Sequence, residues 1–150
     1  MALRIAVLLS GSGTTLENIF AEREHGRLDV DVTAVISSKP GAFGLERARA
    51  HGVAAIAVDR RAYDDERAFN DALHRVLADD PPELLVLAGF LSRIDLRGYN
   101  GRAMNTHPSL IPAFCGKGFY GERVHRAVLE YGAKVTGATI HYCDEQYDTG

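Results

Sequence analysis

Apolar runs alternate with amphipathic segments along the first 90 residues of the chain. Continuous apolar stretches are typical of strands that are buried on both faces of a parallel sheet. Four of them occur, at residues 4–9, 32–36, 53–58 and 83–88. Strands that alternate with helical segments predict an α/β fold, with a doubly wound, mainly parallel sheet and helices on both faces.

The segments between these strands have the spacing of helices. The first helix is predicted to begin at Thr14, where Thr14 and Glu17 fit a capping box. The second is predicted over 42–51 and ends at Gly52. The third is predicted over 64–79, with an inward stripe of apolar residues at i, i+3 and i+4. That stripe consists of Phe69, Leu73, Val76 and Leu77.

The last third of the chain predicts two more strands and a helix. A strand is expected to end near His107, because Pro108 and Pro112 cannot continue a hydrogen-bonded ladder. A helix over 122–131 should bury Val124, Val128 and Tyr131 and stop at Gly132. Alternation over 136–142 predicts a final strand, and residues 143–150 read as a loop.

Composition limits the class of protein. The 150 residues suffice for one domain with one core. The net charge of −3 and the lack of a long apolar run argue against nucleic acid and membrane as partners. The N-terminus has no signal-peptide pattern, so we expect a cytoplasmic protein. In that compartment Cys115 and Cys143 are expected to be free thiols.

The glycine turn after the first strand is a candidate phosphate site. Small residues at 10–13 let backbone amides approach an anion at a helix N-terminus. A dinucleotide fingerprint would need glycine instead of Leu16 and an acidic residue near Ser37 and Ser38, so no nicotinamide cofactor is expected. A P-loop would need a lysine that the turn lacks. The alternative is a tight turn with no ligand.

Asn105 and His107 are candidate catalytic residues. Residues two apart on a strand point to the same face, roughly 6–7 Å apart. An amide can donate to an oxyanion and an imidazole can move a proton, which together suit acyl-group transfer. The alternative is that Asn105 caps a turn and His107 is a surface histidine. His141 and Cys143 match no common metal-ligand spacing, so no metal is expected.

Five motifs in order resemble one family. They are 9–16 (Leu-Ser-Gly-Ser-Gly-Thr-Thr-Leu), 87–90 (Leu-Ala-Gly-Phe), 105–112 (Asn-Thr-His-Pro-Ser-Leu-Ile-Pro), 135–141 and 148–150. The chain resembles the phosphoribosylglycinamide formyltransferase family over its whole length. The resemblance implies a Rossmann-like formyltransferase fold in a single domain, 1–150. It further implies a nucleotide-binding half, 1–100, and a catalytic and folate-binding half, 101–150. Relatives continue past Gly150, so we expect the second half to be incomplete at its C-terminus.

The resemblance implies formyl transfer from 10-formyltetrahydrofolate, as co-substrate, to the amine of 5'-phosphoribosylglycinamide in purine biosynthesis. By the same resemblance Asn105, His107 and Asp148 would be catalytic, acting through a tetrahedral intermediate. Gly13, Thr14 and Thr15 would bind the substrate phosphate. The folate would be bound by Arg60, Leu91, Ser92, Arg93, Ile94, Asn105, Asp144 and Asp148.

Other functions stay open at this point. One is another user of 10-formyltetrahydrofolate, a hydrolase or a methionyl-tRNA formyltransferase. A second is a non-catalytic nucleotide-binding domain of the same fold, because one fold hosts many functions. The partners expected are small-molecule substrates, and the chain would be a monomer or a homodimer.

Overall fold

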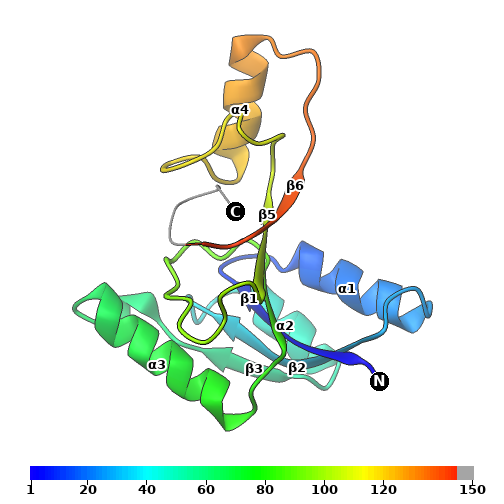
Figure 1. Ribbon diagram of the computed structural model, residues 1–150, viewed down its shortest axis with the longest axis vertical. Coiled ribbons are helices and arrows are strands. Elements are labelled where there is room, and N and C mark those ends of the chain that lie inside the picture. Colours follow the sequence, from blue (N-terminus) through cyan, green and yellow to red (C-terminus); the bar gives the residue numbers. More distant parts are fainter. Residues whose placement is uncertain (145–150) are drawn as a thin grey trace. The chain divides into compact units, whose positions relative to one another are not determined.

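The computed structural model (Figure 1) describes residues 1–144, and the chain forms two compact units, which meet in the sequence between Asp95 and Leu96. The predicted catalytic residue Asp148 lies outside the described residues. The division into halves at residue 100 stays a prediction.

The first unit is built on four parallel strands, as predicted. They are β1 (Leu3–Leu9), β2 (Val30–Ser37), β3 (Ala54–Ala57) and β4 (Leu84–Leu87). Their order is β3-β2-β1-β4, with β1 paired to both β2 and β4. Because all four run the same way, their carboxyl ends meet at one edge of the sheet, where ligands of open α/β folds gather.

Helices cover both faces of this sheet. Helices α1 (Thr14–Glu24) and α2 (Phe43–Ala50) form one apolar cluster with Ile5, Val7 and Leu9 of β1. Ala6 and Leu8 alternate onto the opposite face and are also fully buried. Helix α3 (Glu66–Asp79) lies on the side of the sheet away from α1 (Figure 1). The doubly wound α/β prediction is therefore confirmed.

Helix α3 confirms its predicted stripe and corrects its start. Phe69, Leu73 and Leu77 are buried and Val76 is partly buried. The helix begins at Glu66 instead of residue 64, because the side chain of Asp65 accepts a hydrogen bond from the amide of Ala68 and caps it. A short 3₁₀ helix, η1 (Arg60–Ala62), precedes it and was not predicted.

The predicted capping box at the start of α1 is wrong. The N-cap is Gly13, in the left-handed conformation with φ 74°, and no side chain caps the helix. Glu17 does not turn back to the helix start, because its carboxylate is bound by Arg47 of α2. In a capping box the Glu17 carboxylate would accept a hydrogen bond from the main-chain amide of Thr14. Here Arg47 is the donor to that carboxylate instead.

The second unit contains β5 (Ala103–His107), α4 (Glu122–Tyr131) and β6 (Thr139–Tyr142). Strands β5 and β6 are antiparallel, with Asn105 opposite His141 and His107 opposite Thr139. The bounds of α4 and its end at Gly132 are as predicted. The expected burial of Tyr131 is wrong: the residue is 82% exposed at the last position of the helix, where its ring makes a T-shaped contact with the Phe114 ring.

Candidate active site

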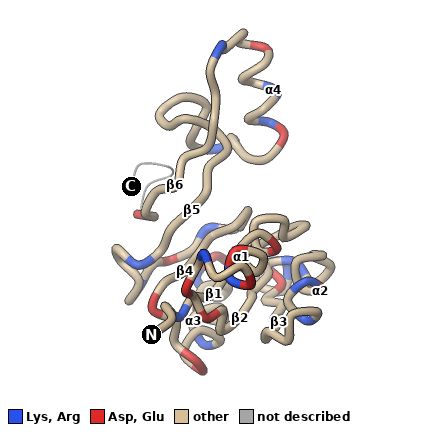
Figure 2. Tube along the Cα trace, turned by 90° about the vertical axis from the view of Figure 1, so that its right-hand side faces the viewer, with Lys and Arg blue, Asp and Glu red and all other residues tan. Residues whose placement is uncertain are grey.

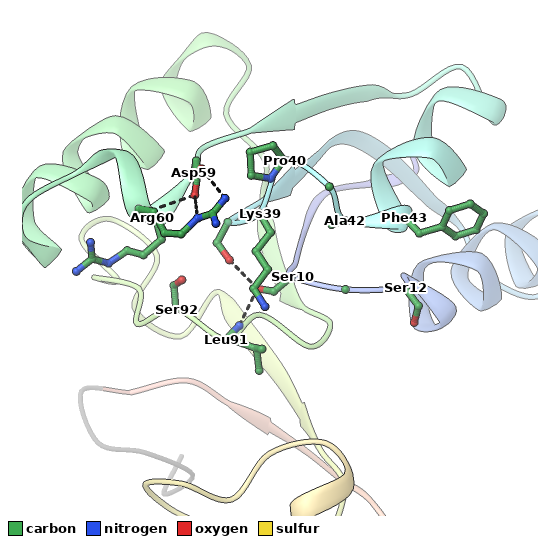
Figure 3. A pocket seen from close by; sticks show the side chains of 14 residues that line it. Ser10, Ser12, Lys39, Pro40, Ala42, Phe43, Asp59, Arg60, Leu91 and Ser92 are labelled. Carbon is green, nitrogen blue, oxygen red and sulfur yellow. Dashed lines mark hydrogen bonds and ion pairs between the residues drawn. The ribbon is translucent and has the colours of Figure 1, made fainter.

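A cavity of about 940 Å³ opens at the carboxyl ends of the parallel strands (Figure 3). The loops that follow β1, β2, β3 and β4 all contribute to it. Its lining residues are Ser10, Gly11, Ser12, Ser38, Lys39, Pro40, Gly41, Ala42, Phe43, Asp59, Arg60, Arg61, Leu91 and Ser92. The position agrees with the rule that ligands of open α/β sheets bind beyond the strand ends.

Three of the predicted folate-binding residues line this cavity, namely Arg60, Leu91 and Ser92. The guanidinium of Arg60 points away from its centre (Figure 3), donates to the carbonyl of Tyr63 and lies 5.7 Å from the centre of the Phe69 ring. Arg93 and Ile94 do not line the cavity. Arg93 instead lies 3.7 Å from a carboxylate oxygen of Glu66.

The predicted phosphate-binding residues sit at the start of α1. Gly13 caps the helix, and Thr14 and Thr15 are its first two residues, both exposed. The first amides of a helix have no acceptor within it and point outward, where an anion can accept them. These three residues do not line the cavity, but Gly11 and Ser12, which lead into them, do.

A buried hydroxyl network ties three of the loops together. Ser10 Oγ lies 2.7 Å from Ser38 Oγ and accepts a hydrogen bond from the amide of Leu91 at 2.9 Å. The two serines are 4% and 3% exposed. Ser10 therefore connects the glycine turn with the loop of Leu91 and Ser92. The sequence pattern indicates neither this connecting role of Ser10 nor its contact with Ser38, because the three loops are far apart along the chain.

Lys39 is a second lining residue that the sequence analysis missed. It follows β2, and Figure 3 shows its side chain extending toward Ser10 and Leu91. An ammonium group at this place can bind an anionic part of a ligand. The signal available in the sequence was its position two residues beyond the end of an apolar strand.

Asn105, in the second unit, is oriented by His141. The Asn105 Nδ2 and His141 Nε2 atoms lie 3.2 Å apart, and His141 Nδ1 lies 3.0 Å from the carbonyl oxygen of Tyr142. A carbonyl only accepts, so Nδ1 carries the hydrogen and Nε2 accepts from the amide. An amide nitrogen has two hydrogens, so one holds Asn105 in place and the other can be donated to an oxyanion.

His107 lies on the same face of β5 as Asn105 and is only 3% exposed. Its Nε2 donates to the carbonyl oxygen of Phe114 at 2.9 Å. Phe114 has a positive φ of 51°, uncommon for a residue with a side chain. This hydrogen bond fixes the orientation of the ring.

The loop after His107 is braced by two hydroxyls. Ser109, completely buried, donates to the carbonyl of Ala113. Thr139 donates to the carbonyl of Ser109 at 2.6 Å and accepts from the amide of Ile111 at 3.0 Å. The prolines alone therefore do not account for the fixed course of this loop. The alternative that His107 is a surface histidine is wrong.

Asp144, a predicted folate-binding residue, is exposed at the end of the described residues.

Within residues 1–144, no group of three or more His, Cys, Asp or Glu side chains could hold a metal ion. In the same range, no helix has both the length and the apolar character that crossing a bilayer requires. Cys115 and Cys143 are free thiols, as predicted.

The Glu17 carboxyl gives the first unit a pH-dependent contact. The hydrogen bond from Arg47 holds the pKa of Glu17 below its ordinary value, although burial acts in the opposite direction. An acid whose pKa falls on folding stabilises the folded state above its unfolded pKa, and this contribution is lost as the pH falls through the folded pKa.

We therefore expect the wild type, relative to Glu17→Gln, to lose stability as the pH falls from about 5 to below 4, where glutamate titrates. Thermal unfolding of both proteins across this range measures the difference. Parallel pH profiles would show that the contact with Arg47 contributes nothing to the folded state.

Comparisons with known proteins agree with these motifs. The family model of formyl transferases matches residues 3–150. The chain is 35% identical over 150 residues to phosphoribosylglycinamide formyltransferase of Bacillus subtilis (strain 168), covering 98% of this chain and 74% of the relative. It is 40% identical to a crystal structure of glycinamide ribonucleotide transformylase 1 from Symbiobacterium toebii, with TM-score 0.91. That match covers 99% of this chain and 69% of the solved one.

Longer relatives match as well. The chain is 37% identical over 151 residues to the chloroplastic phosphoribosylglycinamide formyltransferase of Vigna unguiculata, covering 98% of this chain. It spans 48% of that relative and 52% of the one from Arabidopsis thaliana, about half the length of each.

Proposed function

Since the chain belongs to the formyl transferase family, and within it to the phosphoribosylglycinamide formyltransferases, we propose that it transfers a formyl group from 10-formyltetrahydrofolate to the amine of 5'-phosphoribosylglycinamide. The observation that carries the proposal is the orientation of the Asn105 amide by His141, on the strand face that also holds His107. The relatives' names do not favour the hydrolase, the methionyl-tRNA enzyme or a non-catalytic domain.

The reaction requires the protein to stabilise an oxyanion and to transfer a proton. The substrate amine attacks the formyl carbon, the carbonyl electrons move to oxygen, and a tetrahedral oxyanion forms. The second hydrogen of the Asn105 amide is proposed to bind this oxyanion. The attacking nitrogen must then lose a proton, and the departing folate nitrogen must gain one as its bond to carbon breaks. His107 is proposed to carry that proton, with Asp148 as the third member of the set.

The remaining predicted residues are proposed to bind the two substrates. Gly13, Thr14 and Thr15 would hold the phosphate through the amides at the start of α1. The folate co-substrate would be bound by Arg60, Leu91, Ser92, Arg93, Ile94 and Asp144, together with Asn105 and Asp148. The cavity supports this for Arg60, Leu91 and Ser92, which line it. No step of this chemistry requires a metal or a nicotinamide.

Location and assembly stay predictions. A cytoplasmic location was expected from the sequence, whereas the relatives from Vigna unguiculata and Arabidopsis thaliana are chloroplastic. Small-molecule substrates fit the family. Figure 2 shows basic and acidic positions interspersed along α1 and α2, which supports the expectation that nucleic acid is not a partner.

The test is a spectroscopic formyl-transfer assay with glycinamide ribonucleotide and 10-formyl-dideazafolate. Asn105→Ala is expected to lower kcat by about 10²–10³-fold, the usual effect of removing one oxyanion donor. Asn100→Ala, which removes an exposed amide only five residues away, should leave kcat unchanged. Wild-type protein without formyl transfer, or an Asn105→Ala variant as fast as wild type, would contradict the proposal.

A further inference from the structure

The turn after β1 is held by an arginine from another helix. Arg47 of α2 donates from Nε to the main-chain carbonyl oxygen of Ser12 at 3.0 Å. It also donates from Nη1 to Glu17 Oε2 at 2.7 Å, and Glu17 lies in the first turn of α1. A single guanidinium therefore binds both the turn and the helix that follows it.

Two glycines bring the arginine within reach of the turn. The amide of Gly44 donates to the carbonyl of Gly11 at 3.1 Å. A Cβ atom on Gly13 would lie only 2.6 Å from the Cα of Gly44, so the two backbones are in direct contact. Arg47 follows Gly44 by three residues, on the same side of the helix, and thus faces the turn.

Fixing the Ser12 carbonyl also fixes an amide. The peptide unit between Ser12 and Gly13 is planar and trans, so its C=O and N–H groups point in opposite directions. Since Arg47 binds the oxygen, the N–H of Gly13 is directed to the opposite side. An anion at the start of a helix needs amides that already point toward it, because reorienting them on binding costs affinity.

We propose that Arg47 is a positioning residue for phosphate binding, which sets the peptide between Ser12 and Gly13 so that its N–H faces the substrate phosphate. The inference rests on the proposed function, in which Gly13, Thr14 and Thr15 hold that phosphate. Arg47 acts through the Ser12 carbonyl, and its charge is paired with Glu17, so it does not itself serve as the anion's partner.

The decisive variant is Arg47→Ala in the full chain. The KM for glycinamide ribonucleotide is expected to rise about tenfold, the size of one lost hydrogen bond from a charged donor. The kcat and the KM for the folate should stay within about twofold, because the contacts of Arg47 with the cavity lining are to Ser12 and Phe43, neither of which is proposed to bind folate. A purely structural role would instead lower the active fraction and the melting temperature and leave the ribonucleotide KM unchanged, which would overturn the inference.

Binding of inorganic phosphate gives a readout without turnover. In the wild type, a phosphate titration should shift the backbone amide resonances of Gly13, Thr14 and Thr15. Arg47→Ala should need about tenfold more phosphate for the same shifts. Equal affinity in both proteins would overturn the inference.

Three further variants separate geometry from charge. Arg49→Ala removes the same charge from α2, but among residues 1–144 the partner of Arg49 is Glu46 on the surface, so phosphate affinity should not change. Glu17→Gln keeps the bond to Ser12 and should also bind normally. Arg47→Lys keeps the charge, but a single ammonium group cannot donate to Ser12 and Glu17 in the geometry of the planar guanidinium. Its affinity for phosphate should therefore fall. Wild-type affinity in Arg47→Lys, or an equal loss in Arg49→Ala or Glu17→Gln, would overturn the inference, and Arg47→Lys decides the matter if Arg47→Ala does not fold.

The two proposals fail differently. Wild-type protein that binds phosphate at residues 13–15 without transferring a formyl group would refute the proposed activity. The phosphate affinities of the Arg47 variants would then still test the role of Arg47. Wild-type protein that transfers the formyl group but shows no amide shifts at 13–15 would refute the phosphate placement and the role of Arg47 together.

Discussion

His107→Ala is expected to lower kcat for formyl transfer by about 10²–10⁴-fold, the usual contribution of a positioned acid or base. The ring is buried and held through Nε2 on the Phe114 carbonyl, so water cannot easily replace it as a proton carrier. The KM for glycinamide ribonucleotide should change little, because the phosphate is proposed to bind in the other unit. Steady-state kinetics with both substrates varied would measure the two effects separately.

The control for this variant is His125→Ala, which removes an exposed imidazole from α4 and should leave kcat unchanged. A melting temperature for each protein is needed, because His107→Ala also removes the shorter of two hydrogen bonds to the Phe114 carbonyl and leaves the longer one from Ser109 Oγ, at 3.4 Å. Lost ribonucleotide binding with undiminished turnover at saturation would reverse the assigned roles. If kcat of His107→Ala equals that of the wild type, His107 has no catalytic role.

Gly13→Ala is expected to lower the free energy of unfolding by about 3 kcal/mol, from two separate costs. The residue has φ 74°, where an L side chain is strained, and the added Cβ would lie 2.6 Å from the Cα of Gly44. That atom belongs to the backbone of α2, so it cannot move aside as a flexible side chain would. Urea unfolding followed by circular dichroism would measure the loss.

Gly26→Ala is the matched control. Gly26 has a similar φ of 68°, but nothing lies within 4 Å of the added Cβ. It should therefore show only the backbone cost, about 1–2 kcal/mol. Equal losses in the two variants would mean that the contact between Gly13 and Gly44 contributes nothing, and that the turn is set by its own conformation.

Several features of the fold could be predicted from local pattern. The four apolar runs became parallel strands, and the stripe of Phe69, Leu73 and Leu77 became the buried face of α3. Both predictions depend on burial, which is encoded residue by residue as apolar spacing. The end of β5 at His107 followed from the prolines, which exclude a continued ladder.

The failed predictions had two causes: a distant residue replaced a local partner, and a side chain at a helix end was left exposed. Thr14 and Glu17 fitted a capping box, but Arg47, 30 residues further along the chain, bound the carboxylate more strongly than a backbone amide would. Tyr131 fitted the apolar stripe of α4, yet no element covers it among the described residues except the edge of Phe114.

The sequence by itself determined the α/β class, the order of the strands along the chain, and the residue types at the candidate site, because hydrophobic spacing and motifs are properties of neighbours in the chain. Only the tertiary structure decided how those residues are held. His141 orients Asn105, the Phe114 carbonyl holds His107, Ser10 joins two loops, and Arg47 binds the Ser12 carbonyl. The last three of these hydrogen bonds involve main-chain atoms and leave no trace in local spacing, since any residue can supply the carbonyl or the amide. The first joins side chains 36 residues apart, beyond the reach of any local pattern.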